Sequence, residues 1–458
     1  MIWVKIGGIK YMKSATIIGA GLVGSLWAVY LAKAGYKVKI FEKRPDIRLT
    51  EISAGKSINL ALSTRGWKAF ETVDVADEIR KIAIPMHGRT MHDLEGNLTY
   101  QPYGKKGQAI YSVSRGGINA KMMDIAQQKG KAEIEFNEEC IDIDLENGIV
   151  YLQNTITNEK SEYQSDVIFG ADGANSNVRT YGFEKIPDYQ IEKRPIADGY
   201  REILLPANED GSYKLDLNSL HIWPRGRFML IALPNEDGSF TCTLFMPHAN
   251  DENSFENLNS KEQVKAFFQN TFPDFYALMP EIADSWGDHP LSKLGIIRCY
   301  PWTKGKAALM GDSAHATVPF YGQGMNSGFE DCSALWELME KHGDDWPAIF
   351  SEYQLSRKPN GDAVQDLSLD NYYVMRDFVG DPQFLLQKKF ERRISELYPE
   401  KYMPLYSQVS FSNIPYAVAY KKGKEQDKYI KGLMQENDIN QLFEIDKIDE
   451  LIHQKYAE

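Results

Sequence analysis

The sequence predicts a mixed fold, in which a parallel α/β unit is combined with an antiparallel, β-rich unit and a helical C-terminal part. Three patterns support this prediction: a glycine-rich strand–helix–strand segment at residues 15–42, alternating strands with NEDG turns at 188–288, and charged, helical sequence after residue 345. The spacing of apolar residues distinguishes strands from helices in these segments. At 458 residues, the chain is long enough for two or three domains.

The first segment, ATIIGAGLVGSLWAVYLAKAGYKVKIFE, has the order of a dinucleotide-binding unit. An apolar strand at 15–18 is followed by three glycines, Gly19, Gly21 and Gly24. Gly19 suits a tight turn, Gly21 allows the backbone to approach a pyrophosphate closely, and Gly24 allows the helix to pack against the strand. The helix that begins near Leu22 would direct its unpaired amide groups at the phosphates. A second strand, 37–41, ends on Glu42, which is placed to accept hydrogen bonds from ribose hydroxyls.

A secretion signal is the alternative interpretation of this segment, because Lys13 precedes an apolar stretch rich in small residues. Lys33, Lys37 and the strand that follows argue against it, since the apolar region of a signal has no such continuation. No apolar run approaches the roughly 20 residues of a membrane-spanning helix. We therefore expect a soluble, cytoplasmic protein. No function is assigned to residues 1–11, which precede Met12.

The composition excludes several classes of function. A formal net charge of −12 disfavours binding to nucleic acid or to anionic membranes. Four widely separated cysteines, Cys140, Cys242, Cys299 and Cys332, lack the spacing of a metal site. We expect them to be buried thiols in a reducing compartment, and we expect no metal.

Between these units the predicted elements alternate. SINLALSTRGWKAFETV indicates a short strand and a helix capped by Ser63 or Thr64, and SVSRGGINAKMMDIAQQKG indicates another capped helix. Residues 86–111 resemble an antiparallel insert, and residues 167–179 form a strand that enters an Asp-Gly turn. A helix is expected within 261–270.

A second candidate site follows the strand KAALMGD, which ends on Asp312. A carboxylate there can accept hydrogen bonds from polyol hydroxyls, and the glycines that follow allow the backbone to approach a flat ring. A helix that begins near Asn326 would favour negative charge on a reduced isoalloxazine. Taken alone, the segment is equally consistent with an ordinary strand–loop–helix connection, in which Glu330 and Asp331 favour the helix dipole.

GAGLVG with Glu42, ADGANSNVR and GDSAHATVPFYGQGMN occur in this order. Together they resemble the single-component flavoprotein aromatic hydroxylases, and within them the kynurenine 3-monooxygenase family. The likeness extends through SINLALS, PMHGRTMHDLEG, PYG, YSVSR, NYYVMR and MPLYSQVSF, and covers about residues 12–420. It implies a Rossmann-like FAD-binding domain of the aromatic hydroxylase type with an interleaved, sheet-rich substrate domain. The expected domains are FAD-binding at 12–85, 105–185 and 295–345, β-rich at 86–104 and 186–294, and helical at 346–458.

The resemblance also implies the activity. In that family NADPH reduces bound FAD, O2 adds at the flavin C4a position, and the hydroperoxide hydroxylates L-kynurenine to 3-hydroxy-L-kynurenine, a step of tryptophan degradation and NAD biosynthesis. The sequence has no second glycine motif for the nicotinamide nucleotide, and no local residue decides between NADPH and NADH. Arg179, in the segment that resembles the family's Asp-Gly motif, is a candidate for a phosphate contact.

Two sets of site residues are expected. The residues expected to bind the cofactor, including those of the glycine turn, are Gly19, Gly21, Val23, Gly24, Phe41, Glu42, Lys43, Arg44, Ala61, Arg115, Asp172, Asp312, Gly324, Met325 and Asn326. The substrate set is Arg89, Tyr103, Asn371, Tyr406, Met375, Phe320 and Pro319. By resemblance Arg89 and Tyr103 hold the amino-acid carboxylate, and a guanidinium suits that role because its planar fork matches a carboxylate.

Other roles for these residues stay open. Arg89 could be a solvated arginine, and the tyrosines could be packed aromatics with satisfied hydroxyls. Met375 could equally fill a core. We expect His315 to brace its loop rather than to act as a base.

Two rival functions also remain: a hydroxylase of another aromatic acid on the same scaffold, and a non-catalytic, FAD-binding partner protein. Membrane-bound members of the family carry an apolar C-terminal anchor, whereas residues 421–458 are charged and are expected to be helical.

Overall fold

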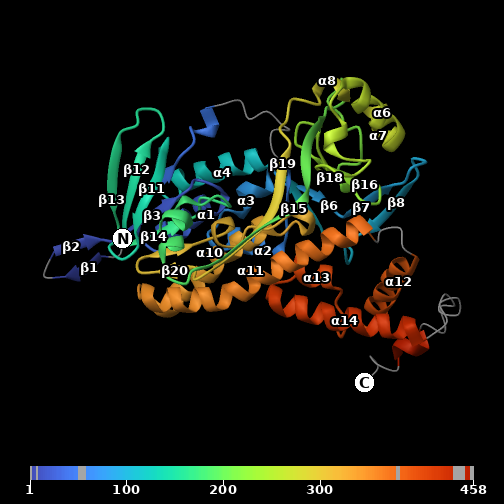
Figure 1. The fold of residues 1–458 in the computed structure, drawn as a ribbon. Helices are drawn as coiled ribbons and strands as arrows, with labels where there is room; N and C mark the ends of the chain where they lie inside the picture. The colour runs from blue at the N-terminus through green and yellow to red at the C-terminus, as the bar shows by residue number, and fades with distance from the viewer. Residues whose placement is uncertain (1–2, 7–8, 50–57, 378–381, 437–448, 454–458) are drawn as a thin grey trace.

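The computed structural model describes residues 3–6, 9–49, 58–377, 382–436 and 449–453 (Figure 1). Side chains are described for residues 12–49, 58–374, 383–436 and 449–453. In Figure 1 the helices α6 (Lys261–Thr271), α7 (Pro273–Leu278) and α8 (Ile282–Ser285) lie at the upper right. Helix α11 (Trp346–Asp377) crosses the lower half of the view, and α12 (Pro382–Leu397) and α14 (Tyr416–Glu436) lie at the lower right.

A six-stranded sheet forms the centre of the first part of the molecule. Its strands, in order across the sheet, are β10 (Glu133–Phe136), β4 (Lys37–Glu42), β3 (Ser14–Ile18), β14 (Val167–Gly170), β21 (Ala307–Leu309) and β20 (Thr303–Lys304). The first five are parallel, and β20 is antiparallel to β21. The sheet therefore collects strands from three separate parts of the sequence, and the loops after their carboxyl ends meet at one edge.

Helix α1 (Leu22–Lys33) packs onto this sheet and is apolar on nearly all sides. Trp27 and Tyr30 are completely buried, and the Trp27 ring meets the edge of Phe169 from β14 at 5.2 Å between ring centroids. Burial on both flanks follows from its neighbours, α4 (Arg115–Gln128) and α10 (Gly324–His342). The predicted strand, glycine turn, helix and strand of residues 15–42 are confirmed.

A seven-stranded sheet forms the second part. Its order is β19 (Ser292–Tyr300), β15 (Gln190–Leu205), β18 (Phe240–Pro247), β17 (Met229–Pro234), β16 (Ser219–Pro224), β7 (Gly88–His92) and β8 (Leu98–Pro102). The neighbours are antiparallel except for β7 and β16, which are parallel. Its core also holds Phe268, Phe272 and Phe275 from α6 (Lys261–Thr271), α7 (Pro273–Leu278) and the residue between them.

Residues 86–111 are only partly what the sequence predicts. β7 and β8 form the expected antiparallel pair, but β7 also joins the large sheet through β16. β6 (Ile84–Met86) and β9 (Ile110–Val113) instead build a three-stranded sheet with β5 (Leu60–Leu62). Pairing between strands so far apart in sequence depends on tertiary packing, which local patterns do not record.

The other elements are two small antiparallel sheets, β1–β2 and β11–β12–β13, and several short helices. The remaining strands are β1 (Trp3–Ile6), β2 (Ile9–Met12), β11 (Glu138–Asp144), β12 (Ile149–Asn154) and β13 (Lys160–Gln164). The short helices are η1 (Ile47–Leu49), α2 (Thr64–Thr72), α3 (Ala76–Arg80), α5 (Asn177–Tyr181), η2 (Phe183–Lys185), η3 (Phe255–Asn257), α8 (Ile282–Ser285), α9 (Asp312–His315) and η4 (Pro319–Tyr321). The predicted cap of α2 is confirmed in position at Ser63, but its side chain makes no capping hydrogen bond.

The C-terminal part is helical, as predicted. Its helices are α11 (Trp346–Asp377), α12 (Pro382–Leu397), α13 (Leu405–Ser410) and α14 (Tyr416–Glu436). Of the expected helical tail, residues 437–448 and 454–458 lie outside the described residues. Within the described ranges, no helix combines the length and hydropathy needed to cross a bilayer. All four cysteines are buried and free, which confirms that they are buried thiols.

Candidate active site

A continuous cavity of about 970 Å³ lies between the carboxyl-end loops of the six-stranded sheet and one face of the seven-stranded sheet. A cavity of this size is at the upper end of the range for small-molecule sites. It brings together both sets of predicted residues. From the cofactor set it is lined by Gly19, Gly21, Val23, Phe41, Glu42, Lys43, Arg44, Ala61, Arg115, Asp172, Asp312, Gly324 and Met325; from the substrate set, by Arg89, Tyr103, Asn371, Tyr406, Phe320 and Pro319.

The glycine turn has the geometry that its sequence requires. Gly19 has a φ of +104°, and its amide donates to the Phe41 carbonyl at 2.8 Å. A Cβ atom on Gly24 would lie 2.1 Å from the Gly19 carbonyl oxygen, so only glycine lets α1 start this close to β3. A Cβ on Gly21 would meet its nearest neighbour, the Ala171 carbonyl oxygen, only at 4.0 Å. Gly24 is thus needed for the packing of α1 against the turn at Gly19, whereas Gly21 borders the open space of the cavity.

We expect Gly24→Ala to destabilise the fold by about 3 kcal/mol, the upper end for overpacking, because the clash is with backbone. Gly21→Ala should keep the wild-type stability but should weaken flavin binding, because its methyl group would enter the cavity. Urea denaturation and flavin titration of both variants test this pair. Equal stability of the two variants would contradict the different roles assigned to the two glycines.

Glu42 is a buried carboxylate at the end of β4, with an exposed fraction of 4%. One oxygen accepts the Ala20 amide of the glycine turn at 2.9 Å, and the other accepts the Arg44 amide and Nε at 3.1 and 2.8 Å. Burial acts to raise the pKa of Glu42, but these bonds to Arg44 and Ala20 lower it overall. The carboxylate is therefore ionised and fixed where α1 begins.

Asp312 follows β21 and starts the short helix α9. Gly311, immediately before it, has a φ of +55°. A Cβ atom on Gly311 would lie 3.0 Å from a methyl carbon of Val23. Burial raises the pKa of Asp312, while the charges of Arg115 and His315 oppose the rise. The tight glycine conformation thus directs a desolvated carboxyl group into the cavity.

His315 ends the short helix α9, three residues after Asp312. Its Nε2 lies 2.7 Å from an Asp331 oxygen, and the same oxygen accepts the Gly311 amide at 2.8 Å. Arg357 Nε donates to the other Asp331 oxygen at 2.7 Å. With His315 only 2% exposed, the geometry agrees with a bracing role.

Asp331 gives the protein an acid-sensitive element. Burial opposes its charge, but His315 and Arg357 lower the pKa of Asp331 to about 2. Its contribution to the free energy of unfolding, about 2 kcal/mol, is fully present above pH about 4 and is lost as the pH falls through about 2. We expect the stability difference between wild type and Asp331→Asn, measured by urea denaturation, to shrink from about pH 5 to about pH 3. A difference that stays constant would contradict this.

Arg89, on β7, lies against two tyrosines. Its Cζ is 5.2 Å from the Tyr103 ring centroid and 4.9 Å from that of Tyr406, and the two rings stack 5.2 Å apart. Burial acts to lower the pKa of Arg89, but its interactions with the two hydroxyls raise it overall. Among the described residues, no ion pair of Arg89 is found, and the Arg89 Nε and the Tyr103 hydroxyl have no hydrogen-bond partner. Buried polar groups usually have partners, so these groups suit an anionic ligand.

Several apolar residues line the cavity beside Arg89 and the two tyrosines. Pro319 and Phe320 line the cavity, and Asn371 Nδ2 donates to the Phe320 carbonyl at 2.6 Å, which fixes this wall. Sequence reasoning missed a further part of the lining, which adjoins Phe320 through Phe245: Met229, Ile231 and Leu233 of β17 with Leu220, Ile222 and Phe245 of neighbouring strands. The alternation of residues along β17 is the signal that could have found them, since every second side chain faces the same side.

Some of the expected site residues do not line the cavity, and others form hydrogen bonds within the protein. Asn326 is buried outside the lining, and its side chain bonds Ala61, Gly322 and Ser63. Gly24 packs inside the glycine turn. The Asp172 carboxylate accepts from the amides of Asn177 and Val178 and from the Ser313 hydroxyl. The side chain of Met375 lies outside the described residues.

The interpretation of Arg179 as a phosphate contact is wrong. The side chain is 1% exposed, and its two terminal nitrogens donate to the carbonyls of Ser313 and Ala174 at 2.7 and 2.6 Å. It therefore ties α5 to the Asp312 loop. Nothing in the local sequence distinguishes such an internal arginine from a phosphate ligand.

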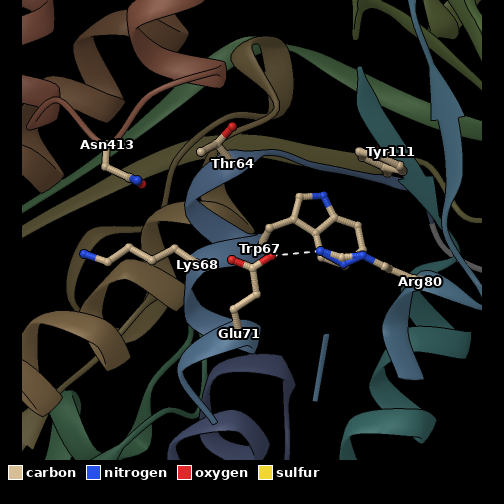
Figure 2. A pocket seen from close by; sticks show the side chains of 7 residues that line it. All are labelled: Thr64, Trp67, Lys68, Glu71, Arg80, Tyr111 and Asn413. Atoms are coloured by element: carbon tan, nitrogen blue, oxygen red, sulfur yellow. Dashed lines mark hydrogen bonds and ion pairs between the residues drawn. The ribbon is translucent and has the colours of Figure 1, made fainter. Parts of the chain in front are cut away.

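A second hollow, of about 300 Å³, lies over the outer face of α2 (Figure 2). Its charged residues are already paired: Arg80 with Glu71 at 2.8 Å and Lys68 with Glu337 at 2.8 Å. The hollow therefore offers no unpaired charge comparable to Arg89.

Comparisons with known proteins identify the family of this chain. The model of a family described as "FAD binding domain" matches residues 12–368. Kynurenine 3-monooxygenase from Flavobacterium johnsoniae is 47% identical to this chain over 437 residues, which are 95% of this chain and 97% of that protein. The chain belongs to the kynurenine 3-monooxygenase family.

The kynurenine 3-monooxygenase family has further members close to this chain. One, from Flavobacterium psychrophilum, is 46% identical over 96% of this chain and 97% of that protein. Among solved structures, the tetrameric form of 2-methyl-3-hydroxypyridine-5-carboxylic acid oxygenase aligns with a TM-score of 0.66, over 81% of this chain and 94% of that chain, at 19% identity. The predicted fold class is confirmed by the family and by this likeness.

The cavity suits the cofactor that the family description names. The first amide groups of α1 have no partner within their helix and open beside Gly21. Glu42 and Asp312 supply carboxylates, and Arg115 supplies a cation at the start of α4. A hydroxyl-rich, doubly phosphorylated molecule with a flat ring matches this arrangement of donors and acceptors.

Proposed function

We propose that this chain is an NADPH-dependent flavoprotein monooxygenase that hydroxylates L-kynurenine to 3-hydroxy-L-kynurenine. The observation that carries the proposal is the charged Arg89, which has no ion-pair partner among the described residues and lies beside two tyrosine rings in the same cavity as the glycine turn. Relatives named kynurenine 3-monooxygenase match over nearly the whole chain and support the choice of substrate.

In this proposal Arg89 binds the carboxylate of the amino acid, with the Tyr103 hydroxyl as a second donor. Tyr406 stacks on Tyr103 and closes the same end. Asn371 fixes the position of Phe320 through its hydrogen bond to the Phe320 carbonyl. Met375, one helical turn after Asn371, is a further candidate for contact with the substrate. Binding energy gained at the carboxylate thus fixes the orientation of an aromatic ring that is some distance from it.

FAD would be held by the glycine turn, Val23, the segment from Phe41 to Arg44, Ala61, Arg115, Asp312, Gly324 and Met325. The chemistry that FAD supplies when bound is the acceptance of electrons from NADPH and the activation of O2. The chain's part is to favour negative charge beside the ring, through the N-terminal end of the 19-residue helix α10 at Gly324. The apolar wall of β17 and Phe320 keeps water from the ring that reacts.

Domain boundaries and location belong to the same proposal. The FAD-binding domain comprises residues 12–85, 105–185 and 295–345, the β-rich substrate domain 86–104 and 186–294, and the helical region 346–458. Four buried, free thiols support a reducing, cytoplasmic location. NADPH is the proposed transient co-substrate, as in the family.

Substrate-dependent NADPH oxidation tests the proposal. L-Kynurenine should accelerate NADPH consumption and yield one hydroxylated product per NADPH, whereas aromatic acids that lack the amino-acid side chain should not. Faster coupled turnover of one of those acids would favour the rival hydroxylase. NADPH consumption that no aromatic compound accelerates would favour a non-catalytic FAD-binding protein.

A further inference from the structure

Arg65, on α2, is a buried cation for which the proposed mechanism has no use. The residue is 1% exposed, and all three guanidinium nitrogens have partners. Nε donates to the Val409 carbonyl at 3.1 Å, Nη2 donates to the Ile414 carbonyl, and Nη1 pairs with Glu330. The guanidinium also lies over the ring of Tyr416, at 3.8 Å from Cζ to the ring centroid.

The two carbonyls belong to the two ends of one turn. Val409 lies in the last turn of α13, where carbonyl groups have no partner within the helix, and Ile414 lies just before α14. A single guanidinium therefore closes the turn of residues 411–415. Helix α13 also carries Tyr406, whose ring stacks on Tyr103 beside Arg89.

The same guanidinium is linked to the Asp312 loop. Glu330, on α10, pairs with Arg357 through its second oxygen, and Arg357 Nε donates to Asp331 at 2.7 Å. Asp331 accepts the amide of Gly311, the residue before Asp312. A chain of alternating charges thus joins the segment that presents Tyr406 to the loop that presents Asp312.

We propose that Arg65 is a positioning residue for substrate binding: by holding the ends of the 411–415 turn against Glu330, it fixes α13 so that Tyr406 closes the amino-acid end of the cavity. The proposal rests on the proposed function, because it needs Tyr406 to contact the substrate. Arg65 would thereby affect substrate recognition although it does not line the cavity.

The chain offers a matched control. Lys68, one turn after Arg65 on α2, pairs at 2.8 Å with Glu337 of α10, so that this ion pair joins the same two helices. The side chains of Lys68 and Glu337 are 46% and 61% exposed. Among the described contacts, neither of them forms a hydrogen bond with the 411–415 turn. Figure 2 shows Lys68 projecting from α2 at the hollow that Asn413 of that turn also lines.

The first test compares Arg65→Lys with Lys68→Met. Lysine keeps the charge next to Glu330 but cannot serve both carbonyls, so we expect the KM for L-kynurenine to rise about tenfold, as for the loss of one hydrogen bond to a charged group. The kcat should stay within about threefold and FAD should remain bound. Lys68→Met should behave as wild type. An unchanged KM in Arg65→Lys, or an equal rise in Lys68→Met, would overturn the proposal.

A double-mutant cycle with Tyr406→Ala tests whether Arg65 acts through Tyr406. Without that ring the position of α13 matters little, so Arg65→Lys should change KM by less than about twofold in the Tyr406→Ala background. Independent, additive effects of the two substitutions would overturn the assignment.

Hydrogen exchange separates this proposal from the proposed function. Amides of the 405–416 peptide should exchange at least about tenfold faster in Arg65→Lys than in wild type, while the peptide of α1 should be unchanged. Wild-type exchange in 405–416, with kynurenine turnover intact, would overturn the role of Arg65 alone. A wild-type enzyme that is inactive towards kynurenine, despite bound FAD, would overturn the proposed function instead.

Discussion

Replacing Arg89 with methionine is expected to raise the KM for L-kynurenine by about 100- to 1,000-fold, the usual cost of removing one partner of a buried, hydrogen-bonded charge pair. The reason is the environment of Arg89: among the described residues no acid neutralises it, so the ligand must supply the negative charge. Methionine keeps most of the side-chain volume, and FAD should remain bound because Arg89 lies with β7 and the tyrosines rather than with the glycine turn.

Arg89→Lys is the matched control for geometry. It preserves a cation but loses the planar fork, so its KM should fall between those of wild type and Arg89→Met. Steady-state kinetics with flavin absorbance measured on the same samples provide the check. A wild-type KM in the methionine variant would remove Arg89 from the substrate site.

The second large effect is expected at Asp312, whose replacement by alanine should weaken FAD binding about 10- to 100-fold. A carboxylate that accepts a hydroxyl hydrogen bond is worth about 1.5–3 kcal/mol, and burial makes the loss harder to compensate with water. Burial raises the pKa of Asp312, so Asp312→Asn, which retains an acceptor without charge, should be the milder variant.

Flavin content of the purified variants and titration of the apoproteins with FAD measure this effect. The alanine variant should lose its yellow colour on dialysis, while Arg89→Met should keep it. A fully yellow Asp312→Ala protein with wild-type affinity would show that this carboxylate does not bind the cofactor.

The elements predicted well from sequence are those with local causes. The turn at Gly19 and the packing at Gly24 follow from contacts within residues 15–42, and a Cβ on Gly24 would meet the Gly19 carbonyl itself. Ser114 caps α4 as expected, by accepting the Gly117 amide at 3.3 Å. In each case the cause lies within a few residues of the effect.

The parts that sequence reasoning missed depend on distant partners. Arg179 and Arg65 are both internal arginines that bond carbonyls, and a cation in a sequence gives no sign of whether it faces a phosphate or a buried carbonyl. β7 joins β16 only because the two segments meet in space. The Asn326 amide bonds three backbone groups near the cavity, which the motif alone does not reveal.

Hydroxylation of L-kynurenine is tested most directly by a single-turnover reaction of the FAD-loaded protein with L-kynurenine, NADPH and isotopically labelled O2, followed by mass analysis. We expect a product heavier than kynurenine by one labelled oxygen atom, formed in wild type and at saturating substrate in Arg89→Lys. A flavin-loaded protein that oxidises NADPH and releases only hydrogen peroxide, with kynurenine recovered unchanged, would contradict it.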